Sequence, residues 1–179
     1  GTLFLDEVAT ASPQLQVKLL RVLQDGRFEP VGSSETRQSD ARVILATNHD
    51  LADEVAAGRF REDLYYRINV IPLELPPLRE RPGDIVLLAE HFLQQFRARM
   101  DTPAERFAPA ALAGLARHDW PGNVRELENA VERAAVLARG PEIVPADLPP
   151  QVRDAGAPAA DDTAPSAPTT LAEAVAHAE

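Results

Sequence analysis

A short apolar run near the start of the sequence, Thr2 to Leu5, stops abruptly at two adjacent carboxylates, Asp6 and Glu7. Such a run predicts a buried β-strand that delivers both acidic side chains at its carboxyl end. Ser12 and Pro13 then provide a helix N-cap and a proline at the first helical position, and apolar residues recur at helical spacing in the segment that follows. The order strand, loop, helix limits the folds open to the chain.

A second apolar run, Arg42 to Thr47, ends at Asn48 and predicts another buried strand. The polar segment before it, Arg27 to Asp40, is expected to form a loop or a hairpin. Because strands alternate with helices, residues 1–80 are predicted to form an α/β layer whose parallel sheet is covered on both faces. An extended segment from Ile68 to Leu75 completes this layer, and the two prolines that follow it close it.

The pattern changes after residue 80, where apolar residues recur only at helical spacing. Helices are predicted from Asp84, from about Pro109 to Arg117 and from Val124 to Ala138, so residues 81–150 are expected to form an all-α lid subdomain. From residue 151 the composition shifts to Ala, Pro, Asp, Ser and Thr, with too few apolar side chains to offset the entropy of ordering. Residues 151–170 are therefore predicted to be a flexible linker.

Composition sets further limits on function. The sequence has no cysteine, which excludes disulfides and thiolate metal sites, and its 18 basic and 28 acidic residues give a net charge of −10, which disfavours contact with a nucleic-acid backbone. No export signal or membrane-spanning apolar stretch is evident, so a cytoplasmic location is expected. The first residue is not Met and the last ten stop within an apolar pattern, so we expect a longer parent protein.

The residues that end the two predicted strands suggest a site. One of Asp6 and Glu7 could hold the hydration shell of Mg²⁺ while the other orients or deprotonates an attacking water. Carboxylates also commonly mark the solvent boundary at a strand end, so the pair alone leaves both interpretations open. Thr47 and Asn48 are less specific, because Asn after a strand is usually a turn residue.

Two arginines, Arg61 and Arg67, lie six residues apart, which places them about 240° apart in azimuth on a helix. They cannot both serve one intramolecular site through the same face. One interpretation is a solvated basic face that pairs weakly with Glu62 and Asp63. The other is an arginine presented to the γ-phosphate of a nucleotide in a neighbouring subunit.

The segment from Trp120 to Leu127 predicts a helix start. Asn123 is expected to cap the helix, and Glu126 to reach back toward the cap. Arg125 then falls in the first turn, where the helix dipole disfavours a cation. This arrangement favours an external anion such as a nucleotide phosphate near Arg125, although an acid within the lid is an equal alternative.

Four segments, GTLFLDEV, RVILATN, FREDLYYRINVIPLELPPLRERPGDI and HDWPGNVRELENAVERA, occur in this order, and together they resemble the sigma-54-dependent transcriptional activators. The resemblance covers roughly residues 1–151. It implies the C-terminal part of an AAA+ P-loop NTPase core followed by a helical lid, with ATP and Mg²⁺ as cofactors. In such signal-responsive or two-component activators, ATP hydrolysis in a ring, usually a hexamer, remodels sigma-54 RNA polymerase so that promoter DNA opens.

The resemblance also implies roles for seven side chains and for one loop. Arg27 to Asp40 would be the second pore-facing insertion, which supports the loop that contacts the sigma factor. The side chains would be the Walker B magnesium ligand Asp6 and the water-activating Glu7, the sensor I residues Thr47 and Asn48, the arginine-finger region of Arg61 and Arg67, and the sensor II residue Arg125.

Parts of the family pattern are expected outside this sequence. The Gly-rich phosphate cradle and the sigma-contacting loop would precede Gly1, so residues 1–179 alone are predicted to have negligible ATPase activity. Residues 171–179, with Leu171 and Val175, resemble the start of a Fis-like helix-turn-helix domain, which implies DNA binding by the parent. The alternatives are another AAA+ remodeller, such as a helicase loader or chelatase subunit, and a non-enzymatic assembly module that contributes arginines in trans.

Overall fold

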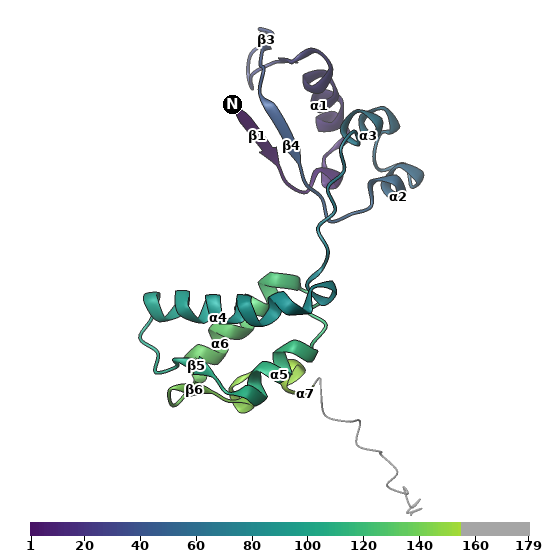
Figure 1. The fold of residues 1–179 in the computed structure, drawn as a ribbon. Helices are drawn as coiled ribbons and strands as arrows, with labels where there is room; N and C mark the ends of the chain where they lie inside the picture. The colour runs from purple at the N-terminus through teal and green to yellow at the C-terminus, as the bar shows by residue number, and fades with distance from the viewer. Residues whose placement is uncertain (155–179) are drawn as a thin grey trace, which may run out of the picture. The chain divides into compact units, whose positions relative to one another are not determined.

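The chain divides into two compact units, which meet in the sequence between Glu74 and Leu75 (Figure 1). The computed structural model describes residues 1–154, and each unit is described by itself. The first unit contains a parallel strand pair with helices, and the second is mainly helical. Within residues 1–154, no helix combines the length and the apolar character needed to span a membrane.

The first unit is organised around two parallel strands, β1 (Thr2–Leu5) and β4 (Arg42–Leu45), in which Leu5 lies opposite Leu45. Both strands were predicted from the sequence. After β1 the chain passes through a short 3₁₀ turn, Val8–Thr10, into helix α1 (Pro13–Asp25). Ser12 caps α1 as expected, because its Oγ accepts a hydrogen bond from the Leu15 amide at 3.3 Å.

Between α1 and β4, where a loop or a hairpin was predicted, the structure has a hairpin in which β2 (Arg27–Phe28) pairs antiparallel with β3 (Arg37–Gln38). Two short helices, α2 (Leu51–Ala56) and α3 (Glu62–Ile68), follow β4. The core of the unit consists of Val8, Leu19, Phe60 and Leu64, with Leu5 and Leu45 of the strands packed against it. The loop after β1, helix α1 and helix α3 are thus joined through one apolar cluster.

The prediction that the sheet is covered on both faces is wrong for the described residues. Side chains alternate along a strand, so Leu5 and Leu45 point into the core while their neighbours Phe4 and Ile44 point to the opposite face. Phe4 is 59% exposed and Ile44 is 41% exposed. The apolar runs were interpreted as buried strands because a continuous apolar sequence does not reveal which face is covered.

The predicted extended segment also differs from the structure. Ile68 is the last residue of α3, and residues 69–77 contain no strand. Val70, Ile71, Leu73 and Leu75 are between 72% and 90% exposed. Among the described residues no strand pairs with this segment, so its alternating apolar side chains remain in solvent.

The second unit begins with a 3₁₀ turn at Leu78–Glu80 and the long helix α4 (Pro82–Arg99). Helices α5 (Pro109–Arg117) and α6 (Asn123–Leu137) follow, close to their predicted limits. The unit is not wholly helical, because β5 (Arg106–Phe107) pairs in parallel with β6 (Glu142–Ile143). A further 3₁₀ turn, Pro145–Asp147, leads to the last described helix.

The core of the second unit is larger than that of the first. It combines apolar side chains of α4, α5 and α6 with Ile143 of β6. At its centre the Trp120 side chain has no exposed surface, and its Nε1 donates a hydrogen bond to the Leu115 carbonyl at 2.9 Å. Satisfying the indole N–H allows this large side chain to be buried without a polar penalty.

The predicted linker begins too early. Residues 151–154 belong to α7 (Pro150–Asp154), and Val152 is 2% exposed in the core of the second unit. One apolar residue in a polar segment is enough to dock a single turn against an existing core. The remainder of the predicted linker, 155–170, and the predicted start of a helix-turn-helix, 171–179, lie outside the described residues.

We predict that Leu127→Ala in α6 destabilises the second unit by about 2–5 kcal/mol, because Leu127 has no exposed surface and truncation leaves a cavity. Urea unfolding followed by the fluorescence of Trp120, the only tryptophan of the sequence, measures this unit selectively. Leu137→Ala in the same helix is the control, because Leu137 is 48% exposed. Equal losses in the two variants would contradict the assigned core.

Candidate functional site

The parallel pairing of β1 and β4 brings the candidate residues Asp6, Glu7, Thr47 and Asn48 to the same end of the strand pair. The pairing continues past the strands. The Ala46 amide donates to the Leu5 carbonyl at 2.9 Å, and the Val8 amide donates to the Ala46 carbonyl at 3.0 Å. The two polar dipeptides therefore follow directly from paired main-chain segments.

Glu7 adopts an unusual backbone conformation, with φ 53° and ψ 40° in the left-handed region. Its amide donates to Asp6 Oδ1 at 2.9 Å, and its carbonyl accepts from the amide and the hydroxyl of Thr10, both at 2.9 Å. Its side chain is left exposed. A non-glycine residue pays about 1–2 kcal/mol for this conformation, and such strain clusters at functional sites. The sequence pattern gave no sign of it.

Thr47 and Asn48 form the start of a turn. Thr47 Oγ1 accepts a hydrogen bond from the His49 amide at 3.1 Å. The hydroxyl oxygen is the acceptor here, so the hydroxyl proton remains available to a ligand. Asn48 is exposed.

A buried carboxylate, which the sequence analysis did not identify, links the turn at His49 to Arg59, two residues before Arg61. Glu54 of α2 accepts two hydrogen bonds from Arg59, at 2.6 and 2.9 Å, and its Oε1 lies 3.3 Å from His49 Nδ1. The hydrogen bonds from Arg59 lower the pKa of Glu54 to about 2. Arg59 lies beyond the end of α2, so a helical spacing rule could not reveal the pair.

The two candidate arginines have different surroundings. Arg61 directly precedes α3, and its guanidinium donates to both carboxylate oxygens of Asp63, at 3.0 and 2.6 Å. These hydrogen bonds raise the pKa of Arg61 and lower the pKa of Asp63. The interpretation of a surface ion pair is therefore confirmed for Arg61 and Asp63. Both side chains of this pair are partly exposed to solvent.

Arg67, in the last turn of α3, contacts another element instead. Its Nε and Nη2 donate to the Leu23 carbonyl of α1 at 3.2 and 2.7 Å. Leu23 lies in the last turn of α1, where free carbonyls and the helix dipole favour a cation. Arg67 thus joins α3 to the carboxyl end of α1.

The helix start that carries Arg125 belongs to the second unit. The expected cap by Asn123 is wrong: Gly122 is at the cap position, and no side chain caps the helix. Asn123 has φ 55°, and its Oδ1 accepts a hydrogen bond from the Leu78 amide at 2.7 Å. The Asn123 side chain therefore binds the distant Leu78 amide instead of an amide in the first turn of its own helix.

The predicted reach of Glu126 toward the helix start is confirmed. Its Oε2 accepts from the Gly122 amide at 2.7 Å, and its Oε1 lies 3.0 Å from His118 Nε2. Arg125 is exposed, and none of the ion pairs formed within residues 1–154 includes it. The alternative of a lid acid as its partner is not found in the described part of the chain.

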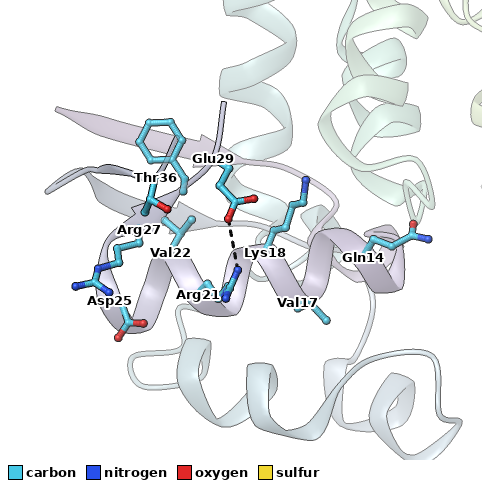
Figure 2. A pocket seen from close by; sticks show the side chains of 10 residues that line it. Gln14, Val17, Lys18, Arg21, Val22, Asp25, Arg27, Glu29 and Thr36 are labelled. Atoms are coloured by element: carbon cyan, nitrogen blue, oxygen red, sulfur yellow. Dashed lines mark ion pairs between the residues drawn. The ribbon is translucent and has the colours of Figure 1, made fainter. Parts of the chain in front are cut away.

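A cavity of about 480 Å³ lies between α1 and the β2–β3 hairpin (Figure 2). Val17, Val22 and Phe28 contribute apolar surface, and Arg21 pairs with Glu29 across 3.7 Å. None of the seven candidate residues lines it. The described residues also contain no cluster of three or more His, Asp or Glu side chains that could hold a metal.

The chain is similar to known protein families over both units. Residues 1–74 match the family described as the sigma-54 interaction domain, and residues 79–165 match the AAA+ ATPase lid domain. Among solved structures, NtrX from Brucella abortus in complex with ATP is 39% identical with a TM-score of 0.82, covering 91% of this chain and 38% of that chain. The structure in complex with ADP has 40% identity and a TM-score of 0.79, covering 85% of this chain and 36% of that chain. The chain therefore has the AAA+ ATPase fold.

Curated relatives narrow this class. The chain is 54% identical over 149 residues to the transcriptional regulatory protein ZraR of Salmonella typhimurium, covering 83% of this chain and 34% of that protein. It is 58% identical over 148 residues to the Nif-specific regulatory protein of Sinorhizobium fredii, covering 83% and 25%. The chain belongs to the sigma-54-dependent transcriptional activators, and it spans about a third or less of the length of these relatives.

The Glu54–Arg59 pair predicts a pH dependence of stability. The ordinary pKa of the carboxyl is 4.5 and the folded value is about 2, so the contribution is present above pH 4.5 and is lost as the pH falls toward 2. In Glu54→Gln, the free energy of unfolding of the first unit should fall less steeply across this window. Tyrosine fluorescence measures it, because both tyrosines lie in α3. An unchanged slope would contradict the assignment.

The strain at Glu7 predicts that Glu7→Asn stabilises the first unit by up to about 1 kcal/mol, because Asn tolerates the left-handed region better than Glu. Denaturant unfolding of the variant and the wild type measures the difference. Asp6→Asn is the control, because Asp6 does not have a positive φ. A Glu7→Asn variant no more stable than the wild type would show that the conformation is not strained.

Proposed function

We propose that the intact protein is a sigma-54-dependent transcriptional activator that hydrolyses ATP as an oligomer and uses the energy to remodel sigma-54 RNA polymerase. The observation that carries the proposal is the placement of Asp6 and Glu7 beside Thr47 and Asn48, at the same end of two parallel strands. Ligands of open α/β sheets bind at the carboxyl ends of the strands. Family membership makes a nucleotide the expected ligand.

Asp6 and Glu7 are proposed to act on the metal and on water, respectively. Two adjacent carboxylates suit Mg²⁺, which prefers oxygen ligands and is usually held by one or two carboxylates together with waters and substrate phosphates. The ion would neutralise charge on the phosphates. The exposed side chain of Glu7 would orient the attacking water, and the bonds from Thr10 to its main chain hold its position.

The arginines are proposed to serve the nucleotide of a neighbouring subunit. We assign the principal role to Arg61, because a partly exposed ion pair with Asp63 is weak and exchanges readily for a phosphate. Arg67 is held by two hydrogen bonds to the Leu23 carbonyl at the end of α1. Its proposed contribution is therefore smaller.

The remaining candidate residues are proposed to report the state of the nucleotide. Thr47 and Asn48 would contact the γ-phosphate as sensor I, and Arg125 would contact a phosphate as sensor II. The exposed position of Arg125 in the first turn of α6 supports this role, since the helix start favours an anion. The β2–β3 hairpin would be the pore-facing insertion that supports the sigma-contacting loop.

The resemblance to the family suggests further properties of the intact protein. We propose a ring, usually a hexamer, promoter binding through a Fis-like helix-turn-helix domain, a signal-responsive or two-component input and a cytoplasmic location. A response regulator, FleR of Pseudomonas aeruginosa, is 54% identical over 148 residues, covering 83% of this chain and 31% of that protein. Residues 1–179 contain no Gly-rich phosphate cradle, so this segment by itself is expected to show negligible hydrolysis.

The proposal predicts that the ATPase rate of the intact protein rises with its concentration, because each site is completed by a neighbour. Glu7→Gln should lower kcat by at least about 10²-fold. Arg61→Ala should lower it by about 10³-fold or more, and Arg67→Ala by less. A coupled assay of phosphate release measures all three.

Arg153→Ala is the matched control, because within residues 1–154 the ion pair of Arg153 is with its neighbour Asp154, and both side chains are partly exposed. The dependence on sigma-54 is tested by ATP-driven opening of a promoter complex with sigma-54 polymerase. An ATPase rate that is unchanged by both Glu7→Gln and Arg61→Ala would refute the assigned site. Hydrolysis that depends on them without promoter opening would favour another AAA+ remodeller.

A further inference from the structure

The side chain of Gln16 is buried without belonging to the apolar core. Gln16 lies in α1 and is 1% exposed, whereas glutamine is mostly found at the surface. Its Nε2 donates to the carbonyls of Ala11, at 2.8 Å, and Arg59, at 3.1 Å, while its Oε1 accepts from the Arg61 amide at 2.9 Å. One amide thus joins α1 to main-chain groups 43 and 45 residues away.

The bonds to Arg59 and Arg61 fix the main chain on both sides of Phe60. The Phe60 side chain is 3% exposed and packs in the core of the first unit. With Phe60 directed inward and both flanking groups bound, the Arg61 side chain is directed away from the core. Because Arg61 immediately precedes α3, the same bonds set where that helix starts.

The hydrogen bond from Gln16 Nε2 to the Ala11 carbonyl connects Gln16 to the strand ends. The Ala11 amide donates to the Val8 carbonyl at 3.1 Å, and the Val8 amide donates to the Ala46 carbonyl at 3.0 Å. Ala46 directly precedes Thr47, and Val8 directly follows Glu7. Hydrogen bonds therefore run from the ends of β1 and β4, through Gln16, to the main chain of Arg61, and α1 lies beside α3 (Figure 1).

We propose that Gln16 is a positioning residue that holds Arg61 in the orientation from which it serves the nucleotide of a neighbouring subunit. The residue is not itself catalytic, because it is buried and both ends of its amide bind main-chain groups of its own subunit. This inference rests on the proposed function, in which the arginine acts in trans. It predicts that Gln16 is needed in the subunit that donates the arginine rather than in the subunit that hydrolyses ATP.

Mixed oligomers of the intact protein test this directly. Donor subunits carry Glu7→Gln and keep both arginines, whereas acceptor subunits keep Glu7 and carry Arg61→Ala with Arg67→Ala. Each should be nearly inactive alone, and a mixed ring should hydrolyse ATP mainly where an acceptor site meets a donor arginine. Gln16→Met is then introduced into the donor alone or into the acceptor alone, since Met fills a similar volume without the amide.

In the donor, Gln16→Met should lower the rate of the mixture at least tenfold, and in the acceptor it should change the rate less than twofold. Gln14→Met, at an exposed position of the same helix, should have no effect in either subunit. Gln16→Asn, which keeps an amide on a shorter side chain, should also fail in the donor. It replaces Gln16→Met if that variant does not fold or assemble.

The proposal is overturned if Gln16→Met lowers the ATPase rate of the mixture equally in the donor and in the acceptor, because this result would indicate a general structural role. A loss confined to the acceptor overturns it as well, because Gln16 would then serve the carboxylates of its own site. If donor and acceptor with Gln16 intact do not restore hydrolysis when mixed, the shared site of the proposed function fails instead. The two failures are therefore distinguishable.

Discussion

The parallel register of β1 and β4 is the constraint on which the candidate site depends. Leu5 opposite Leu45 sets Asp6 and Glu7 against the turn that contains Thr47. A shift by one residue would turn every side chain of a strand to the other face, which would remove Leu5 or Leu45 from the core. The core packing that stabilises the first unit therefore also positions the polar residues at its strand ends.

Three arginines near the end of the first unit are each held by a partner within that unit. Asp63 holds the guanidinium of Arg61, the Leu23 carbonyl holds Arg67, and Glu54 holds Arg59. These partners differ in strength, because a surface ion pair exchanges with solvent whereas a hydrogen-bonded group in a packed segment costs free energy to release. This difference in strength means that Arg61 can turn toward a ligand more easily than Arg67, which joins α3 to α1.

Patterns along the sequence predicted β1, β4, α1 and the helices α4, α5 and α6 of the second unit, because these depend on local periodicity and capping. They did not predict interactions between distant segments. Asn123 was expected to cap its own helix but binds the Leu78 amide. Gln16 lies between Leu15 and Val17 in α1, and its burial depends on main-chain groups that are distant in the sequence. The exposure of Phe4 was missed for the same reason, since burial depends on what covers a face.

The two units use the same device beside an arginine. In each, an uncharged side-chain amide, Gln16 or Asn123, accepts a hydrogen bond from a main-chain amide 45 residues away in sequence. Gln16 binds the main chain of Arg61 itself, and Asn123 lies two residues before Arg125. An amide fixes the direction of a segment through its geometry and adds no net charge. A carboxylate in the same place would attract the neighbouring guanidinium and compete with a phosphate for it. These neutral side chains thus hold the main chain beside each arginine without adding a further negative charge next to it.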